Sequence, residues 1–94
     1  MKKRTTNNNI IVYSKNNCGY CDKAKALLKG LGLSFEVKKM EEFESVDAML
    51  KDIGKKVRSM PQIKIDGELV GGYNQLIEFY NKKGLVDFKG NVKR

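Results

Sequence analysis

Apolar residues along this chain follow first a strand-like and then a helix-like spacing. Residues 10–13 (Ile-Ile-Val-Tyr) are continuously apolar and rich in β-branched side chains, which predicts a strand buried on both faces, as in a parallel sheet. After a polar loop, apolar residues recur at the i, i+3, i+4, i+7 positions of one helix face: Ala24, Leu27, Leu28 and Leu31. Asn17 is the predicted N-cap of this helix, and Gly30 and Gly32 mark its end.

The remaining pattern predicts further strands and helices in a definite order. Residues 34–38 alternate as a second strand, and with the preceding strand and helix they complete a right-handed βαβ unit. A second helical face covers residues 46–53 and ends near Gly54. Residues 62–65 alternate as a strand, Asp66-Gly67 is a hairpin signal, and residues 68–70 form the antiparallel partner. A third helical face runs from Tyr73 to Tyr80 and is closed by Gly84. The order β-α-β-α-β-β-α predicts an α/β protein with the thioredoxin fold, a four-stranded mixed sheet carrying three helices.

Length and composition bound the domain organisation. The chain of 94 residues is sufficient for one domain, predicted over residues 10–94, and the polar, Asn-rich residues 1–9 predict a disordered tail. No run of about 18 apolar residues exists, so no membrane segment is expected. The basic N-terminus is not followed by the apolar core of a signal peptide, which predicts a cytoplasmic protein.

The charge balance is strongly basic. The net charge is +8, from 19 Lys and Arg against 11 Asp and Glu. Basic tails can contact nucleic acid, but no nucleic-acid motif and no basic stripe interleaved with aromatic residues is present. We therefore expect a solvated surface that attracts anionic substrates, and nucleic-acid binding with steep salt dependence is the alternative.

The only two cysteines stand two residues apart in Cys18-Gly19-Tyr20-Cys21, where the first strand gives way to the first helix. In a small α/β domain this arrangement indicates a thiol–disulfide redox site. A structural zinc site needs four Cys or His ligands, and this chain has no His, so one chain offers no such metal site. A chance pair of buried thiols is the remaining alternative.

The position of each cysteine on the helix predicts its role. Cys18 falls in the first turn, where free N–H groups and the helix dipole stabilise an anion, so its pKa should be lowered and it should be the attacking sulfur. Cys21 lies one turn deeper on the core-facing side and should act second, as the resolving thiol. Lys15 adds positive charge beside the thiolate or is an ordinary solvated lysine.

Four linked motifs make the chain resemble the dithiol glutaredoxins from about Ile10 to Gly84. The motifs are Tyr13-Ser14-Lys15 leading into the cysteines and Asp22-Lys23-Ala24, the segment from Arg58 to Ile63 around Met60-Pro61, the Asp66-Gly67 turn, and Gly71-Gly72-Tyr73. The resemblance implies a glutathione-dependent thiol–disulfide oxidoreductase that reduces protein disulfides and glutathione mixed disulfides. It also implies an electron-transport role, with ribonucleotide reductase as one protein substrate of a monomeric enzyme.

The resemblance also implies site residues. Cys18 forms the mixed disulfide with glutathione, and Cys21 reduces bound protein disulfides. Glutathione is the cosubstrate, and no metal is required. The residues implied to bind glutathione are Lys15, Tyr20, Met60, Pro61, Gly72, Tyr73, Asn74 and Gln75. Within that set Lys15 meets a carboxylate, the Met60 backbone pairs with the tripeptide, and Pro61 is cis, which the sequence alone does not establish. Gln62 and Arg58 are weaker candidates for the glycyl end.

Two departures from the family pattern bear on function. Gly19 stands where many dithiol members have proline, and Asn74-Gln75 stands where many carry Asp, so glutathione's amino group loses a charge partner. Gly19 is shared with the monothiol, cluster-carrying members, whereas Tyr20 and Cys21 are not, and a proline in place of Gly19 would stiffen the loop. A second hypothesis is therefore a [2Fe–2S] carrier, in which two chains each give Cys18 and two glutathiones supply the other thiolates.

Overall fold

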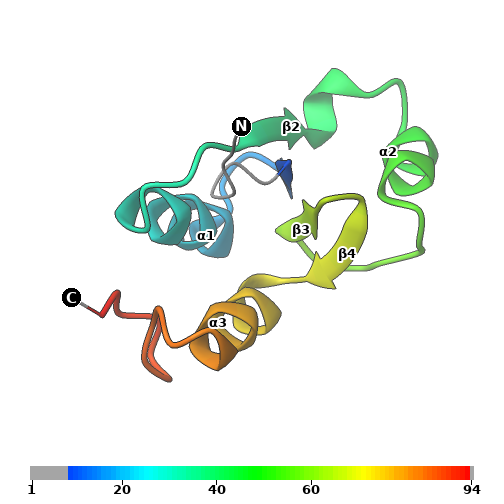
Figure 1. Cartoon of the computed structure of the whole chain (residues 1–94). Helices are drawn as coiled ribbons and strands as arrows, with labels where there is room; N and C mark the ends of the chain where they lie inside the picture. The colour runs from blue at the N-terminus through cyan, green and yellow to red at the C-terminus, as the bar shows by residue number, and fades with distance from the viewer. Residues whose placement is uncertain (1–8, 94) are drawn as a thin grey trace.

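The chain folds into one four-stranded sheet with helices on both faces (Figure 1). The computed structural model describes residues 9–93. Its elements are β1 (Ile10–Ser14), α1 (Gly19–Gly30), β2 (Glu36–Lys39), the 3-10 turn η1 (Met40–Glu42), α2 (Val46–Ile53), β3 (Gln62–Ile65), β4 (Glu68–Gly71) and α3 (Tyr73–Lys82). The predicted order β-α-β-α-β-β-α is confirmed, and η1 is the one addition within it.

The strand order β2-β1-β3-β4 makes the sheet mixed, as predicted. β1 pairs parallel with β2 and antiparallel with β3, so that Val12 lies between Val37 and Ile63. The β3–β4 pair is the hairpin predicted from Asp66-Gly67. β1 has a partner on each side and helices on both faces, which explains why its sequence is continuously apolar.

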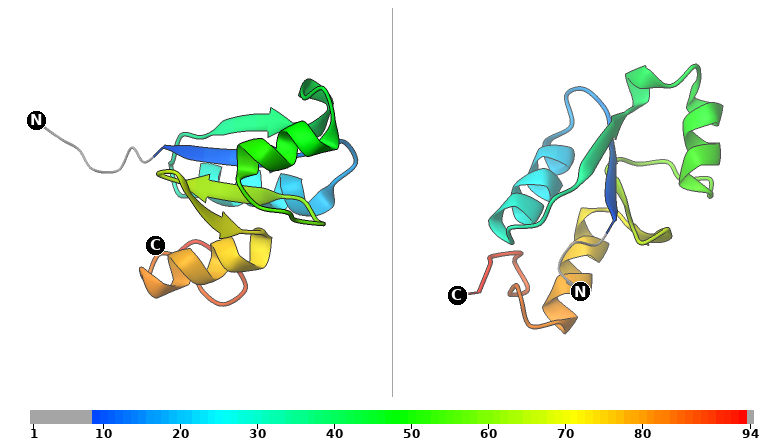
Figure 2. Two further views of the ribbon diagram at one scale, coloured as in Figure 1. Left: turned by 90° about the vertical axis from the view of Figure 1, so that its right-hand side faces the viewer. Right: turned by 45° about the horizontal axis from the view of Figure 1, so that its top comes forward.

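The two faces of the sheet carry separate apolar clusters. On one face, Ile10, Val12 and Ile63 pack with α1 and α3, through residues such as Leu28 and Leu76. On the other face, Tyr13 packs with Met49 and Ile53 of α2. Figure 2 (right) shows α1 and α3 together on one side of the sheet and α2 alone on the other.

The start of α1 differs from the prediction. Asn17 is not the N-cap; Cys18 is, and its sulfur accepts a hydrogen bond from the Cys21 N–H at 3.2 Å. Asn17 instead adopts a left-handed conformation with φ 57°, which asparagine tolerates better than most residues. The N-cap of α1 is thus a cysteine sulfur that lies at the positive end of the helix dipole.

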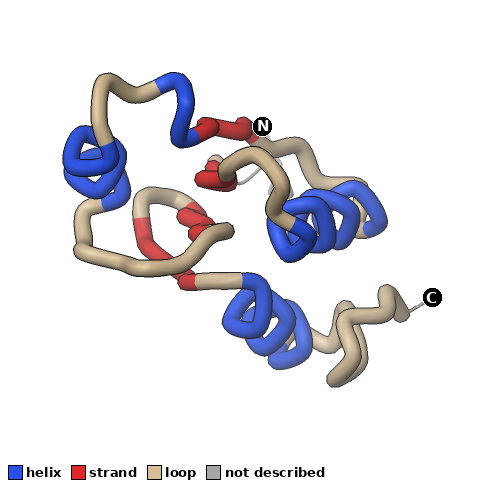
Figure 3. Tube along the Cα trace, turned by 180° about the vertical axis from the view of Figure 1, so that it is seen from behind, coloured by secondary structure: helices blue, strands red, loops and turns tan. Residues whose placement is uncertain are grey.

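Both ends of the chain extend beyond the predicted elements. Most of the predicted tail lies outside the described residues, but Asn9 exchanges two hydrogen bonds with Asp66, at 3.0 and 2.8 Å. After α3, Val86 pairs with Val92, and the Asp87 carboxylate accepts from the backbone N–H of Lys89 and Asn91. This hairpin, residues 85–93, folds back beside α3 as the loop seen from behind in Figure 3. Its few apolar residues carry no helical or strand period, which is why the sequence pattern did not predict it.

A polar network ties α2 to the sheet and predicts a pH dependence of stability. The Asp52 carboxylate accepts from the Tyr13 hydroxyl at 2.7 Å and from the Lys38 ammonium at 3.1 Å. The Tyr13 hydrogen bond, followed by that of Lys38, lowers the pKa of Asp52. Burial, with the nearby Asp52 charge, raises the pKa of Tyr13.

Asp52→Asn should therefore destabilise the protein at pH 7 and destabilise it less as the pH falls toward 3. A carboxyl whose folded pKa lies below its unfolded value of about 3.9 contributes stability above that value. It loses this contribution as pH falls through the folded pKa. The Asp52 side chain is 38% exposed, so we expect an effect below about 1 kcal/mol. Urea unfolding of both proteins from pH 7 to pH 3 measures it, and an equal gap at both ends of the range would contradict the assignment.

Candidate redox site

The two cysteines form a disulfide across the first turn of α1. Cys18 and Cys21 are bonded, with Cα atoms 5.2 Å apart, which is consistent with the dithiol motif. Cys21 is 1% exposed, whereas Cys18, the N-cap, is half-buried. An external thiol therefore reaches the sulfur of Cys18 and not that of Cys21.

Two backbone groups surround the Cys18 sulfur. The Cys21 N–H donates to it at 3.2 Å, and the Met60 carbonyl oxygen lies 3.6 Å away. In the disulfide Cys18 carries no thiol hydrogen, so the second approach is a contact and not a hydrogen bond. The N–H and the helix N-terminus favour a thiolate, in the way that a capping carboxylate is favoured. The lowered pKa of Cys18 remains a prediction.

The loop before β3 supplies one wall beside the disulfide. The Met60–Pro61 peptide bond is cis, as the resemblance implied. The Gln62 side chain donates to the Ser59 carbonyl at 2.9 Å and is 6% exposed, so it secures the loop from inside. The Gln62 side chain is therefore not at the surface, where it would have to be to contact the glycyl end of glutathione. Arg58 is exposed, and its candidate role at the glycyl end stays untested.

A pocket of about 280 Å³ adjoins the disulfide. It is lined by Tyr20, Ser59, Met60, Pro61, Gly72, Tyr73, Asn74 and Gln75. These are all the residues that the resemblance implied for glutathione except Lys15, and Ser59 is the addition. The signal for Ser59 was its place directly before Met60-Pro61. Lys15 is exposed and forms no ion pair within residues 9–93, so its role stays a prediction.

The first turn of α3 and its N-cap line one side of this pocket. The Gly72 N–H donates to the Gln75 side-chain oxygen at 3.0 Å, one half of a capping box. The next N–H groups, those of Tyr73 and Asn74, belong to the first turn, which has no intrahelical acceptors. Together with the helix dipole they form an environment suited to a carboxylate. No acidic residue lies in this turn.

Two of the residues that line the pocket, Tyr20 and Tyr73, have aromatic side chains. The rings of Tyr20 and Tyr73 lie 6.0 Å apart, and the Lys23 ammonium lies 5.1 Å from the Tyr20 ring centroid. Tyr20 is 58% exposed, although it stands inside the CxxC motif. The two tyrosine rings and Lys23 thus place apolar surface and positive charge near Cys18.

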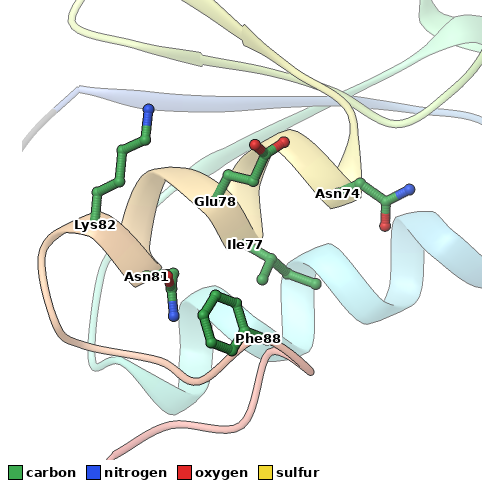
Figure 4. Close-up of a pocket in the computed structure, with 6 residues that line it drawn as sticks. All are labelled: Asn74, Ile77, Glu78, Asn81, Lys82 and Phe88. Carbon is green, nitrogen blue, oxygen red and sulfur yellow. The ribbon is translucent and has the colours of Figure 1, made fainter.

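A larger hollow lies elsewhere and is not the redox site. Its volume is about 440 Å³, and it is lined by residues of α3, among them Ile77, and by the exposed Phe88 of the C-terminal hairpin (Figure 4). Only Asn74 is shared with the pocket beside the disulfide. We assign the chemistry to the smaller pocket because Met60, one of its lining residues, has its carbonyl oxygen 3.6 Å from the Cys18 sulfur.

The described residues contain neither a cluster of metal ligands nor a membrane-spanning helix. Across residues 9–93 no group of three or more His, Cys, Asp or Glu is arranged to hold a metal ion. The [2Fe–2S] cluster that two chains would share through Cys18 stays a prediction. In the same range no helix is long and apolar enough to cross a bilayer.

Gly19→Pro is predicted to stabilise the protein. Gly19 is the first helical residue, where proline is favoured because its missing N–H has no intrahelical acceptor. A Cβ at Gly19 meets nothing within 4 Å, and Cys18 already has the extended conformation (φ −120°, ψ 101°) that a following proline requires. We expect a gain of about 0.5–1 kcal/mol in the free energy of unfolding, from reduced freedom of the unfolded chain. Urea unfolding measures this gain, with Gly19→Ala as control, and a loss of stability would contradict the reading of this turn.

The fold and the cysteine pair define a thiol–disulfide oxidoreductase with the thioredoxin fold. The family's sequence model, described as glutaredoxin, matches residues 10–70, and the chain belongs to the glutaredoxin family.

Individual relatives agree with that assignment. Glutaredoxin 3 of Escherichia coli K12 is 35% identical over 78 residues, covering 82% of this chain and 92% of that protein. Glutaredoxin 1 of Rickettsia conorii is 39% identical over 80 residues, covering 83% of this chain and 76% of that protein. The crystal structure of a buckwheat glutaredoxin–glutathione complex superposes with a TM-score of 0.67 at 29% identity, covering 81% of this chain and 71% of that one.

Proposed function

We propose that this protein uses glutathione to reduce protein disulfides and glutathione mixed disulfides. The observation that carries the proposal is a pocket that includes an anion-suited helix start and Met60, whose carbonyl oxygen lies 3.6 Å from the sulfur of Cys18, the more exposed cysteine of the disulfide. The buckwheat relative was crystallised as a complex with glutathione. The pocket of this chain, with a helix N-terminus and two tyrosine rings, has groups that suit the same ligand.

Reduction of the enzyme begins at Cys18. A glutathione thiolate attacks the Cys18 sulfur, the bond to Cys21 breaks, and Cys21 leaves as a thiolate that takes up a proton. A second glutathione thiolate attacks the glutathione sulfur of the Cys18 mixed disulfide. Glutathione disulfide leaves, and Cys18 becomes the free thiolate, stabilised by the Cys21 N–H.

Reduction of a target runs through the same sulfur. The Cys18 thiolate attacks a disulfide or a glutathionylated cysteine and forms a mixed disulfide with release of one thiolate. Cys21, one helical turn away, then attacks the Cys18 sulfur, releases the second thiolate and restores the enzyme disulfide. With a glutathionylated target, the mixed disulfide joins Cys18 to glutathione, and a glutathione thiolate can instead attack its glutathione sulfur, which releases glutathione disulfide and the free Cys18 thiolate.

We assign glutathione contacts by chemistry. The free N–H groups of Tyr73 and Asn74 receive the γ-glutamyl carboxylate, and the Met60 backbone pairs with the tripeptide. The Tyr20 and Tyr73 rings cover its apolar surface. Lys15 is the proposed partner of the other carboxylate. Ribonucleotide reductase as a substrate, an electron-transport role and a monomeric state rest on the resemblance, and the cytoplasmic location stays a prediction from the sequence.

The test is a coupled assay on the wild-type protein. Reduction of a small glutathione mixed disulfide is followed through NADPH consumption by glutathione reductase, in parallel with an assay driven by thioredoxin reductase. We expect turnover that saturates with the mixed disulfide in the first assay and background rates in the second.

A non-reactive analogue separates binding from simple thiol reactivity. S-methylglutathione should inhibit competitively, whereas N-acetyl-S-methylcysteine, which lacks both terminal carboxylates of the tripeptide, should not. Turnover only with thioredoxin reductase, or equal effects of the two analogues, would contradict the use of glutathione.

A further inference from the structure

Ser14, the last residue of β1, carries a buried hydroxyl that the mechanism so far leaves unused. Ser14 is 1% exposed, and its Oγ is the one side-chain N or O atom of the described residues that is buried without a hydrogen-bond partner. A hydroxyl withdrawn from water with no partner is unfavourable, and such groups are rare in folded proteins. Its position therefore needs an explanation.

The strand geometry directs Ser14 toward the start of α1. Side chains alternate along a strand, so Ser14 faces the same side as Ile10 and Val12, which pack with α1 and α3. Because β1 and β2 are parallel, α1 runs back along the sheet in the opposite direction. The C-terminal end of β1 is thus level with the first turn of α1 (Figure 2).

The first residue of the buried face of α1 is Cys21, which is 1% exposed. In the disulfide its sulfur is bonded to Cys18 and carries no hydrogen. On reduction that sulfur becomes a thiol, a weak hydrogen-bonding group, or a thiolate, a strong acceptor, in a place that water does not reach, so a hydrogen-bond donor within the protein stabilises it.

We propose that the Ser14 hydroxyl is the hydrogen-bond partner of the Cys21 sulfur in the dithiol form, and that it shifts the redox equilibrium toward that form. In the disulfide form the two groups are not hydrogen-bonded to each other, because the bond to Cys18 holds the Cys21 sulfur away from the Ser14 hydroxyl. Reduction breaks that bond, and the Cys21 side chain is then free to turn and accept from the hydroxyl. Ser14 is thus a positioning residue for the resolving thiol. The proposal rests on the cysteine pair and not on the use of glutathione.

The equilibrium is written with dithiothreitol as reductant. The enzyme disulfide and one dithiothreitol give the Cys18 and Cys21 thiols and cyclic oxidised dithiothreitol, so two electrons and two protons pass to the enzyme. Ser14→Ala removes the partner of the reduced form and the unsatisfied hydroxyl of the oxidised form. Both changes favour the disulfide.

The test is a redox titration of wild type and Ser14→Ala in dithiothreitol buffers, with the fraction of free thiols read by alkylation. A single buried hydrogen bond corresponds to roughly a fivefold change in an equilibrium constant. We therefore expect reduction of Ser14→Ala to be roughly fivefold less favourable, a potential about 20 mV more negative at about 30 mV per tenfold. Ser14→Thr, which keeps the hydroxyl, should stay within about twofold of wild type. Ser34→Ala, an exposed serine in the loop after α1, should not change the titration.

A merely structural role for Ser14 would change the stability of both redox forms equally and leave this equilibrium unmoved. An unchanged titration of Ser14→Ala, or a shift toward the dithiol, would overturn the proposal. Equal shifts in Ser14→Ala and Ser14→Thr would overturn it as well, because packing rather than the hydroxyl would then be responsible. Dithiothreitol needs no glutathione pocket, so failure here is separate from failure of the proposed function.

Discussion

Cys18→Ser is expected to lower the rate of glutathione mixed-disulfide reduction at least about 1,000-fold, to the uncatalysed background. The serine hydroxyl is not ionised at neutral pH and does not form a covalent intermediate with a disulfide sulfur. The same N-cap hydrogen bond from the Cys21 N–H still forms with the serine oxygen, so α1 stays capped. The loss of rate therefore reports the chemistry of the sulfur and not the fold, and the coupled assay with circular dichroism measures both.

Cys21→Ser is the matched variant at the second position of the motif. We expect it to keep mixed-disulfide reduction within about threefold of wild type, because glutathione itself releases the product from Cys18. It should lose reduction of protein disulfides and accumulate a mixed disulfide on Cys18, visible by mass spectrometry. Cys21 is buried and Cys18 is half-buried, which gives this asymmetry a structural basis. The reverse pattern, with activity surviving in Cys18→Ser, would show that the two roles are assigned in the wrong order.

The sequence predicted the fold well because each element carries a strong local signal. α2 has four apolar residues on one face, and Gly54 ends it in the left-handed conformation that glycine favours. β3 and β4 are joined at Asp66-Gly67, where both residues have positive φ, as a tight hairpin turn requires. The C-terminal hairpin has no such period, and its stability comes from the Asp87 turn and from burial of Val86, which only the folded chain brings together.

The site was less accessible to sequence reasoning for a physical reason. The pocket joins three segments distant in the chain, the start of α1, the loop before β3 and the start of α3, and no local pattern relates them. The resemblance named most of the lining, but local reasoning placed the N-cap on Asn17, because a cysteine sulfur is an unusual capping group. The unpartnered hydroxyl of Ser14 has no sequence signal at all, since burial and the absence of a partner are properties of the fold.

Leu28→Ala should lower the free energy of unfolding by about 3 kcal/mol and the melting temperature by about 15 °C. Leu28 is 0% exposed at the centre of the cluster between the sheet and α1, and truncation leaves a cavity that the surrounding strands and helices cannot close. Leu85→Ala is the matched control, because Leu85 is 43% exposed, and we expect it to cost less than about 1 kcal/mol. Urea and thermal unfolding of the three proteins measure these differences.

The same variants separate stability from catalysis. The disulfide joins residues only three apart, so it closes a very short loop and restricts the unfolded chain little. An enzyme that opens this bond in every turnover must instead hold its redox site through the apolar clusters, so the loss in Leu28→Ala should be similar in the oxidised and reduced forms. Leu28 lies two helical turns beyond Cys21, and the rate per folded molecule should therefore stay near that of wild type. A destabilisation confined to the reduced form would mean that the disulfide, and not the core, holds the first turn of α1 in place.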